Sequence, residues 1–399
     1  MMKCVEKMDT KDKSQTLKET KTIQLFRPEY NVDIPNALAR IFDSGWTGLG
    51  PKTEEFENAV ATYLDTPHAI AFNSCTAALQ VAIFALRLPR GSLVITTPIT
   101  FISTNHCIIH AGYYPIFADV DPTTGNIDGE SVKRLLVDPF LKGRIKAIIM
   151  VHYGGEPVAM EELYDVANEN ELIAIEDAAH AFGSTYQDKN IGCGLSGLVC
   201  FSFHAVKPLA IGDGGMLTTH SDIINDFARK MRWCGIDKST TQRTVGSGYS
   251  WDYNVVYTGF KSHMNDIQAV IGLKQLEQFD NNQNIKQSLV DYYRENLERI
   301  KGVTLLAHDS QCVSANHLMP ILIKNRDEVM QHLADNGIQT GVHYRPSTHY
   351  SMYKRFESDN GCPNANEFFK KELSLPLHLH LTKDDIDYIC NKIEEVVKC

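Results

Sequence analysis

Lys207 is a residue that could carry out covalent chemistry. It stands in the segment FSFHAVKPLAIGDGGMLTT (201–219), between a strand-like run and a glycine-rich turn. A lysine at a strand end can point into a cleft and form a Schiff base if the site lowers its pKa from roughly 10.4, because only a neutral amine attacks a carbonyl. Most lysines are surface residues, so Lys207 taken alone does not decide the matter.

An acidic residue ends another strand-like run. The segment LIAIEDAAHAFGS (172–184) reaches Glu176 and Asp177, and ligands of parallel α/β sheets bind at the carboxyl ends of the strands. A carboxylate there could keep a pyridine nitrogen protonated, which pyridoxal phosphate (PLP) needs in order to act as an electron sink. Alternation along the strand directs Glu176 to the other side, so Asp177 is the better candidate. As an alternative, Asp177 caps the alanine-rich segment that follows.

A junction between a strand and a helix could bind a phosphate. In AIAFNSCTAALQVAIFAL (69–86), residues 73–76 precede an expected helix, whose first turn offers free N–H groups and a favourable dipole. Ser74 and Thr76 could add hydroxyl hydrogen bonds, although capping explains them equally well. The order of phosphate loop, aspartate and lysine along the chain is the order expected of a PLP enzyme, and it favours the chemical interpretation of all three.

The elements around these residues indicate an α/β fold. Strand-like runs alternate with helical stretches such as MEELYDVANEN; the runs are LVITTP, YYPIFADV, IKAIIMVHY, LIAIED and LVCFSFH. This pattern is typical of parallel strands covered by helices on both faces. Residues 267–300 predict one or two long helices, and the last hundred residues mix strands and helices. We expect a disordered N-terminal extension (1–24), a large domain (25–285) and a smaller C-terminal α+β domain (286–399).

Composition excludes several other classes of protein. The formal net charge of -10 argues against a nucleic-acid binder, because a phosphate backbone needs a basic surface. No apolar run is long enough to span a membrane, and the polar first twenty residues lack a secretory signal. The ten cysteines form no CxxC pair and show no regular spacing with histidine. We therefore expect a cytoplasmic protein with reduced thiols and no metal site.

The chain resembles the nucleotide-sugar aminotransferases of the DegT/StrS type, over roughly residues 25–397. The resemblance rests on many ordered segments, among them GWTGLGPKTEEFE, NSCTAALQVAI, VHYGGEPVAM, IEDAAHAFGS, FSFHAVKPLAIGDGGMLTT, GFKSHMNDIQAVIGLKQLEQFD and LSLPLHLHLT. It implies the aspartate aminotransferase fold (fold type I of PLP enzymes), with a mostly parallel mixed sheet in the large domain. It also implies a homodimer with shared active sites.

The resemblance implies a role for each matching residue. Lys207 is the Schiff-base lysine and proton shuttle, and Asp177 pairs with the pyridine nitrogen. The other residues implied to contact the cofactor are Phe101 stacked on the ring (alternatively an ordinary core aromatic), Cys75, Thr76 and Ser202 at the phosphate, His180 near the phenolic oxygen, and His263 at the phosphate of the neighbouring subunit.

The lysine also bears on the type of reaction. Certain dehydratases of the resembled family have histidine at the position of Lys207, so the retained lysine favours transamination. The substrate implied is a sugar nucleotide, in our leading interpretation a 4-keto-6-deoxyhexose that glutamate aminates at C4. Amination at C3, another PLP reaction such as aldol cleavage or dehydration, and a non-catalytic regulator on the same fold are the alternatives.

One segment near the C-terminus could bind this substrate. GVHYRPSTHY (341–350) offers His343, Tyr344, Arg345 and His349. Arginine and neutral histidine can both donate hydrogen bonds to phosphate oxygens, which suits a diphosphate. A turn whose aromatic residues pack on the large domain would explain the segment equally well.

Overall fold

The computed structural model describes residues 22–193, 197–238, 244–245, 248–249, 251–356 and 361–397. Residues 1–21 of the expected N-terminal extension lie outside this part of the chain. Ile23, which we also placed in the extension, is 5% exposed and forms a β-bridge with Ile338. Among the described cysteines, free thiols are found at Cys75, Cys107, Cys193, Cys200, Cys234, Cys312 and Cys390.

A seven-stranded mixed sheet forms the centre of the larger part of the molecule. In spatial order its strands are β1 (His68–Phe72), β9 (Gly215–Thr219), β8 (Val199–Ser202), β5 (Ile173–Asp177), β4 (Ile145–Val151), β2 (Leu93–Thr96) and β3 (Tyr114–Phe117). Neighbouring strands are parallel except at β9, which is antiparallel to both β1 and β8. The strand-like runs of the sequence are thereby confirmed as strands of one mostly parallel sheet.

Helices cover both faces of this sheet, which explains why its strands are apolar on both sides. Along β4, Ile148 and Met150 pack into one hydrophobic cluster while Ala147 and Ile149 pack into another, because successive side chains of a strand point to opposite faces. The first face is covered by α2 (Pro51–Leu64), α5 (Gly129–Val137), α6 (Met160–Glu169) and α9 (Asp266–Leu276), and the second by α3 (Cys75–Ala85), α4 (Ser103–His110) and α7 (Asp222–Met231).

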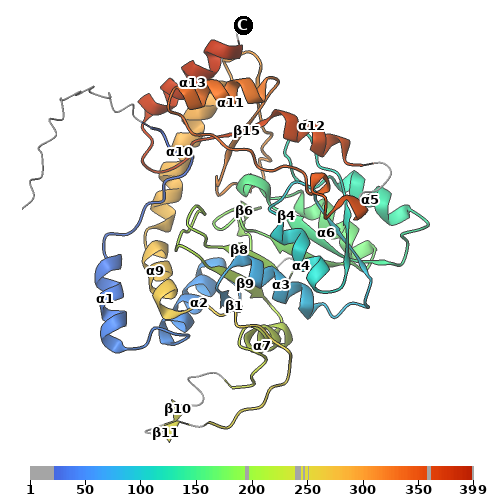
Figure 1. Ribbon diagram of the computed structural model, residues 1–399, viewed down its shortest axis with the longest axis vertical. Coiled ribbons are helices and arrows are strands. Elements are labelled where there is room, and N and C mark those ends of the chain that lie inside the picture. Colours follow the sequence, from blue (N-terminus) through green and yellow to red (C-terminus); the bar gives the residue numbers. More distant parts are fainter. Residues whose placement is uncertain are drawn as a thin grey trace, which may run out of the picture.

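The C-terminal part has a core of its own, above the large sheet in Figure 1. Its antiparallel sheet comprises β12 (Val303–Leu305), β14 (Met319–Ile323) and β15 (Glu372–Leu375). The helices α10 (Phe279–Leu297), α11 (Arg326–Asp335) and α13 (Lys383–Val397) contribute to the same core. The expected domain boundary after residue 285 falls inside α10, which runs from the large sheet to the C-terminal part.

Shorter elements complete the described chain. They are α1 (Ile34–Ser44), α12 (Pro363–Lys371), the 3₁₀ turns η1 (Tyr153–Gly155), η2 (Ser347–His349) and η3 (Lys354–Phe356), and the strands β6 (Thr185–Tyr186), β7 (Lys189–Asn190), β10 (Thr244–Val245), β11 (Gly248–Tyr249) and β13 (Cys312–Val313). Among the described helices, none combines the length and apolar composition that crossing a bilayer requires.

Candidate active site

A cavity of about 460 Å³ lies at the carboxyl ends of the parallel strands. Asp177, the last residue of β5, and the loop after β8 both reach it, as expected for the ligand site of an open α/β sheet. Nine of the residues singled out from the sequence line this one cavity: Ser74, Cys75, Thr76, Phe101, Asp177, His180, Ser202, Lys207 and Tyr344. The fold thus brings together residues that are far apart in the chain.

Lys207 stands in a tight turn beyond β8. Its backbone N–H donates to the carbonyl of His204 at 2.9 Å, and its Nζ lies 3.1 Å from Nε2 of His317. Burial lowers the pKa of Lys207 to about 8, partly opposed by the nearby Cys75 and Asp177. At pH 7 roughly a tenth of the amine is therefore neutral, far more than for an ordinary lysine, and the neutral amine is the state that can attack a carbonyl.

Asp177 is 3% exposed and held by two hydrogen bonds. The Thr104 hydroxyl donates to its Oδ2 at 2.6 Å, and the N–H of Ala179 donates to its Oδ1 at 3.1 Å. Burial raises the pKa of Asp177, while these bonds and the charge of Lys207 oppose the shift. Glu176 lies on the opposite face, with its Oε2 2.9 Å from Nε2 of His152, so that Asp177 lines the cavity and Glu176 does not.

The junction between β1 and α3 forms one wall of the cavity. The Ser74 hydroxyl caps α3 by accepting from the N–H of Ala77 at 3.2 Å, and Ser74, Cys75 and Thr76 all line the cavity. Gly215 of β9 lies against this turn so closely that a Cβ there would come within 2.4 Å of the Cys75 nitrogen. Capping and cavity lining therefore occur together, and glycine is what allows the helix terminus to approach the sheet.

The imidazole of His180 is neutral, and its hydrogen-bond partners indicate which ring nitrogen carries the proton. The N–H of Gly154 donates to its Nδ1 at 3.1 Å, so the proton of the neutral ring is on Nε2, which lies 3.0 Å from the Tyr344 hydroxyl. Burial and the charge of Lys207 hold the pKa of His180 well below its usual value. Phe101 is 58% exposed at this side of the cavity, with its ring 6.4 Å from that of Tyr344. An exposed aromatic face beside buried polar groups suits a planar ligand.

The other candidates for substrate binding lie outside the lining of this cavity. His343 packs edge-on against Tyr344 and contacts Ser374, with its Nδ1 2.9 Å from Oγ. Arg345 lies over the ring of Tyr350, and His349 is hydrogen bonded to Asn366 at 2.7 Å. Arg345 and His349 thus make local packing contacts, which is the alternative to substrate binding that the sequence left open.

His263 also lies outside the lining of this cavity. It forms a β-bridge with Phe72 and packs edge-on against Trp233, with ring centroids 4.5 Å apart. Its Nδ1 is buried without a hydrogen-bond partner in the described part of the chain. Burial lowers the pKa of His263 to about 4, so the ring is neutral near pH 7.

Comparison with known proteins decides the family. The model of the DegT/DnrJ/EryC1/StrS aminotransferase family matches residues 28–394. The chain belongs to this family. Its members are PLP-dependent aminotransferases, and this aminotransferase shares their α/β architecture, so the predicted fold class and enzyme class are confirmed.

Three relatives give the range of similarity. The spore coat polysaccharide biosynthesis protein SpsC of Bacillus subtilis is 37% identical over 373 residues, which cover 90% of this chain and 93% of SpsC. The UDP-4-amino-4,6-dideoxy-N-acetyl-β-L-altrosamine transaminase of Campylobacter jejuni is 30% identical over 371 residues, covering 92% and 95%. The PLP-form structure of Spr1654 from Streptococcus pneumoniae superposes with a TM-score of 0.86 at 27% identity, covering 95% of this chain and 99% of Spr1654.

Sequence reasoning missed three residues at the active site of this aminotransferase. Thr104 bonds Asp177, His317 contacts Lys207, and Phe26 stacks on the His317 ring with centroids 5.5 Å apart. None lies in a motif with Asp177 or Lys207, and each approaches from a distant part of the chain. An alternation of polar and apolar residues gives no sign of such contacts.

Proposed function

We propose that this aminotransferase holds PLP on Lys207 and transfers the amino group of glutamate to a nucleotide-linked keto-deoxysugar. The observation that carries the proposal is the placing of Lys207 and Asp177 in one cavity whose wall is the N-terminus of α3. A lysine with a lowered pKa, a buried carboxylate and a helix N-terminus match the aldehyde, the ring nitrogen and the phosphate of PLP.

The described residues fit the size and chemistry of this cofactor. Gly215 allows β9 to pack closely against the turn that begins α3, and the backbone N–H groups of that turn, Thr76 and Ser202 would hold the phosphate. The exposed face of Phe101 would stack on the ring, and the Nε2–H of His180 lies on the same side of the cavity.

Lys207 and Asp177 have different roles in the proposed reaction. Bound PLP supplies an aldehyde for condensation with amines and a ring that accepts electron density. Lys207 would anchor the cofactor and, once released from it, would carry a proton to and from the substrate carbon. Asp177 would hold a proton on the ring nitrogen. General acid–base help of the kind given by Lys207 typically contributes about 10²–10⁴-fold.

The sugar is proposed as a 4-keto-6-deoxyhexose linked to a nucleotide, aminated at C4. In support, the Campylobacter jejuni relative is named for a UDP sugar with an amino group at C4 and no oxygen at C4 or C6. Tyr344, which lines the cavity, and His343 beside it are proposed to contact the sugar. Arg345 and His349 remain candidates for the outer, nucleotide end.

Product analysis tests this assignment. Enzyme incubated with glutamate and UDP-linked 4-keto-6-deoxyhexose should form 2-oxoglutarate and a 4-amino sugar nucleotide in equal amounts, detected by mass spectrometry and NMR. A 3-keto isomer serves as the matched control and should react at least about tenfold more slowly, since the carbonyl would be displaced from Lys207. Rapid exchange between free amino acids and 2-oxo acids, with no reaction on any sugar nucleotide, would contradict the sugar assignment and leave the PLP assignment standing.

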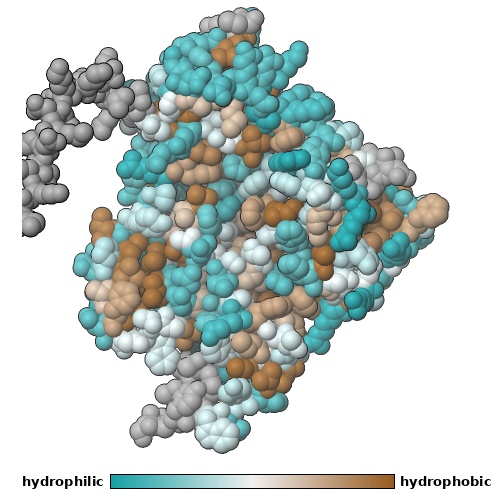
Figure 2. Space-filling view, in the orientation of Figure 1, coloured by the Kyte–Doolittle hydropathy of each residue, from teal (hydrophilic) through white to brown (hydrophobic). Residues whose placement is uncertain are grey.

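We further propose that two copies of the chain form composite active sites. Figure 2 shows hydrophobic residues gathered over α1 and α9, where Leu38, Phe42 and Ile271 are partly or fully exposed. The segment GFKSHMND ends at the start of α9 beside this patch, and Asp266 fixes it by accepting from the N–H of Gly50 at 3.0 Å. Apolar surface of this kind supports an interface with a second copy. His263 would reach the cofactor phosphate of that copy.

Subunit mixing tests the shared site. When Lys207→Ala and His263→Ala proteins are exchanged in equal amounts, about a quarter of the wild-type activity should return, because half of the dimers hold one intact site. Mixing Lys207→Ala with Asp177→Asn should restore nothing, because both residues belong to the same chain's cavity. Absence of recovery in the first mixture, with exchange proven by tagged subunits, would show that His263 does not serve the neighbouring site.

A further inference from the structure

Lys207 has one side-chain hydrogen-bond partner among the described residues, and it is a buried histidine. Nε2 of His317 lies 3.1 Å from Lys207 Nζ, and His317 is 4% exposed. His317 precedes β14, so it approaches from the C-terminal part of the molecule, 110 residues away in the chain. The contact therefore connects the amine to the second core of the molecule.

The ring of His317 packs against two other rings. Phe26 stacks on it with an interplanar angle of 9°, and the ring of His180 is tilted against it by 50° with centroids 4.3 Å apart. Its backbone N–H donates to the carbonyl of Gly154 at 2.9 Å. A ring packed in this way has few alternative rotamers, so Nε2 is aimed at Lys207 before any ligand binds.

The turn that holds His317 also holds His180. The N–H of Gly154 donates to His180 while its carbonyl accepts from His317. At Gly155, where φ is +101°, a Cβ would come within 3.2 Å of the His317 nitrogen and 3.0 Å of the His180 carbonyl oxygen. Glycine is therefore required for the segment before β14 to pack against this turn.

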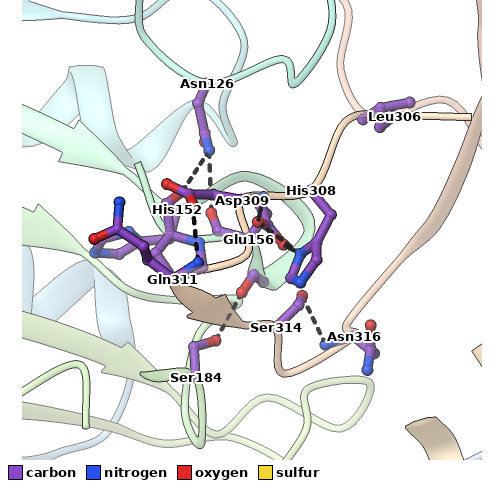
Figure 3. Close-up of polar contacts among 12 residues, drawn as sticks. Asn126, His152, Glu156, Ser184, Leu306, His308, Asp309, Gln311, Ser314 and Asn316 are labelled. Carbon is purple, nitrogen blue, oxygen red and sulfur yellow. Dashed lines mark hydrogen bonds and ion pairs between the residues drawn. The ribbon is translucent and has the colours of Figure 1, made fainter. Parts of the chain in front are cut away.

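Figure 3 shows how that segment is fastened. Ser184 donates to the carbonyl of Gly155 at 2.7 Å and accepts from the N–H of Ala315 at 3.0 Å. At the start of the segment, both carboxylate oxygens of Glu156 lie 3.0 Å from Nδ1 of His308. Residues 308–316 thus run along the loop 152–156 and carry His317 to its position.

The surroundings of His317 keep its ring neutral, so its Nε2 accepts a hydrogen bond and does not bind a proton. Burial and the charge of Lys207 hold the pKa of His317 well below its usual value, so the ring is neutral near pH 7. An ammonium or amine of Lys207 donates to the free Nε2, with the ring proton on Nδ1. The titratable groups that act on the pair are Cys75 and Asp177 at Lys207, and His180, His343 and Lys286 at His317.

We propose that His317 is the positioning residue of Lys207: it accepts one N–H of the amine and thereby directs the amine's lone pair into the cavity. The same contact would receive the amine again after the amino donor displaces it. This proposal rests on the proposed function, because it assigns His317 a role only if Lys207 is the residue that reacts with PLP.

The test measures capture of PLP by cofactor-free enzyme, read from the absorbance of bound cofactor, with the site located by borohydride reduction and peptide mass spectrometry. His317→Phe keeps a ring between Phe26 and His180 but has no acceptor, and it should capture PLP about tenfold more slowly, the effect of one lost hydrogen bond. His317→Gln restores a polar atom near the position of Nε2 and should recover most of the rate. His332→Phe, on α11 with its Nε2 3.1 Å from Glu395 and outside the cavity lining, should capture PLP at the wild-type rate.

The pH profile separates positioning from a general loss of structure. Burial lowers the pKa of Lys207 to about 8, so wild-type capture should rise as the pH passes through 8 and level off above it, where the amine is neutral. In His317→Phe the plateau should fall while the enzyme stays folded by circular dichroism. Equal plateaus for wild type and His317→Phe would overturn the role of His317. Absence of capture at Lys207 in the wild type would overturn the proposed function itself.

A measurement on the wild type covers the case in which His317→Phe does not fold. In ¹⁵N-histidine spectra, the Nε2 resonance assigned to His317 by its loss in His317→Gln should be that of an unprotonated nitrogen from pH 6 to about 8 and should move in Lys207→Ala. A protonated Nε2 at the resonance assigned to His317 would contradict the proposal.

Discussion

Lys207→Ala is expected to abolish both the covalent attachment of PLP and the transamination reaction. Lys207 is the lysine that shares a cavity with Asp177, and burial lowers its pKa to about 8. Alanine removes the amine that binds the cofactor and carries the proton, so turnover should fall on the order of 10⁴-fold, the upper end of what a positioned acid–base group contributes. Borohydride should no longer fix PLP to the peptide that contains residue 207.

A second lysine provides the matched control. Burial also lowers the pKa of Lys286 to about 8, and this residue lines a smaller neighbouring cavity with Lys207. Lys286→Ala should still form the reducible adduct at Lys207, because reactivity requires the facing carboxylate and phosphate site as well as a neutral amine. An adduct that survives Lys207→Ala and disappears in Lys286→Ala would show that the assignment of the Schiff-base lysine is wrong.

The backbone positions of the site could be predicted from the sequence because they follow from strand ends. Asp177 and Lys207 lie just at and beyond the ends of β5 and β8, which are neighbouring parallel strands. Periodicity alone locates such ends, and it also separates Asp177 from Glu176 by face. The same reasoning gives no position for Arg345 and His349, which lie outside the lining of the cavity, because η2 lies in a turn with no regular alternation.

Contacts between distant segments could not be predicted in this way. Thr104 meets Asp177 across 73 residues, and His317 meets Lys207 across 110. Both pairings depend on how α4 and the segment before β14 pack on the sheet, which depends on side-chain volumes throughout the core. A glycine pair such as Gly154-Gly155 marks a special turn in a sequence but not the residues that it holds.

Asp177→Asn is expected to retain PLP but lose most of its turnover. Lys207, the N-terminus of α3 and the exposed face of Phe101 stay in place, so the cofactor should bind. The amide can still accept the Thr104 hydrogen bond, but it cannot keep a proton on the ring nitrogen, so turnover should fall about 10²–10³-fold, as on loss of other preorganised electrostatic contacts. Turnover per bound PLP, measured with glutamate as the amino donor, is the quantity to compare.

Asp177→Asn should also change the pKa of Lys207. The charge of Asp177 raises the pKa of Lys207 and so opposes the effect of burial. Removing that charge should lower the pKa further, and PLP capture should then reach its plateau at a lower pH than in the wild type. Glu176→Gln is the control from the other face of the same strand: it removes a carboxylate while its amide oxygen can still accept from Nε2 of His152, and turnover per bound PLP should stay within about twofold of the wild type. If Asp177→Asn kept the wild-type turnover, the buried carboxylate would have a structural role beside Thr104 and the ring nitrogen would require another partner.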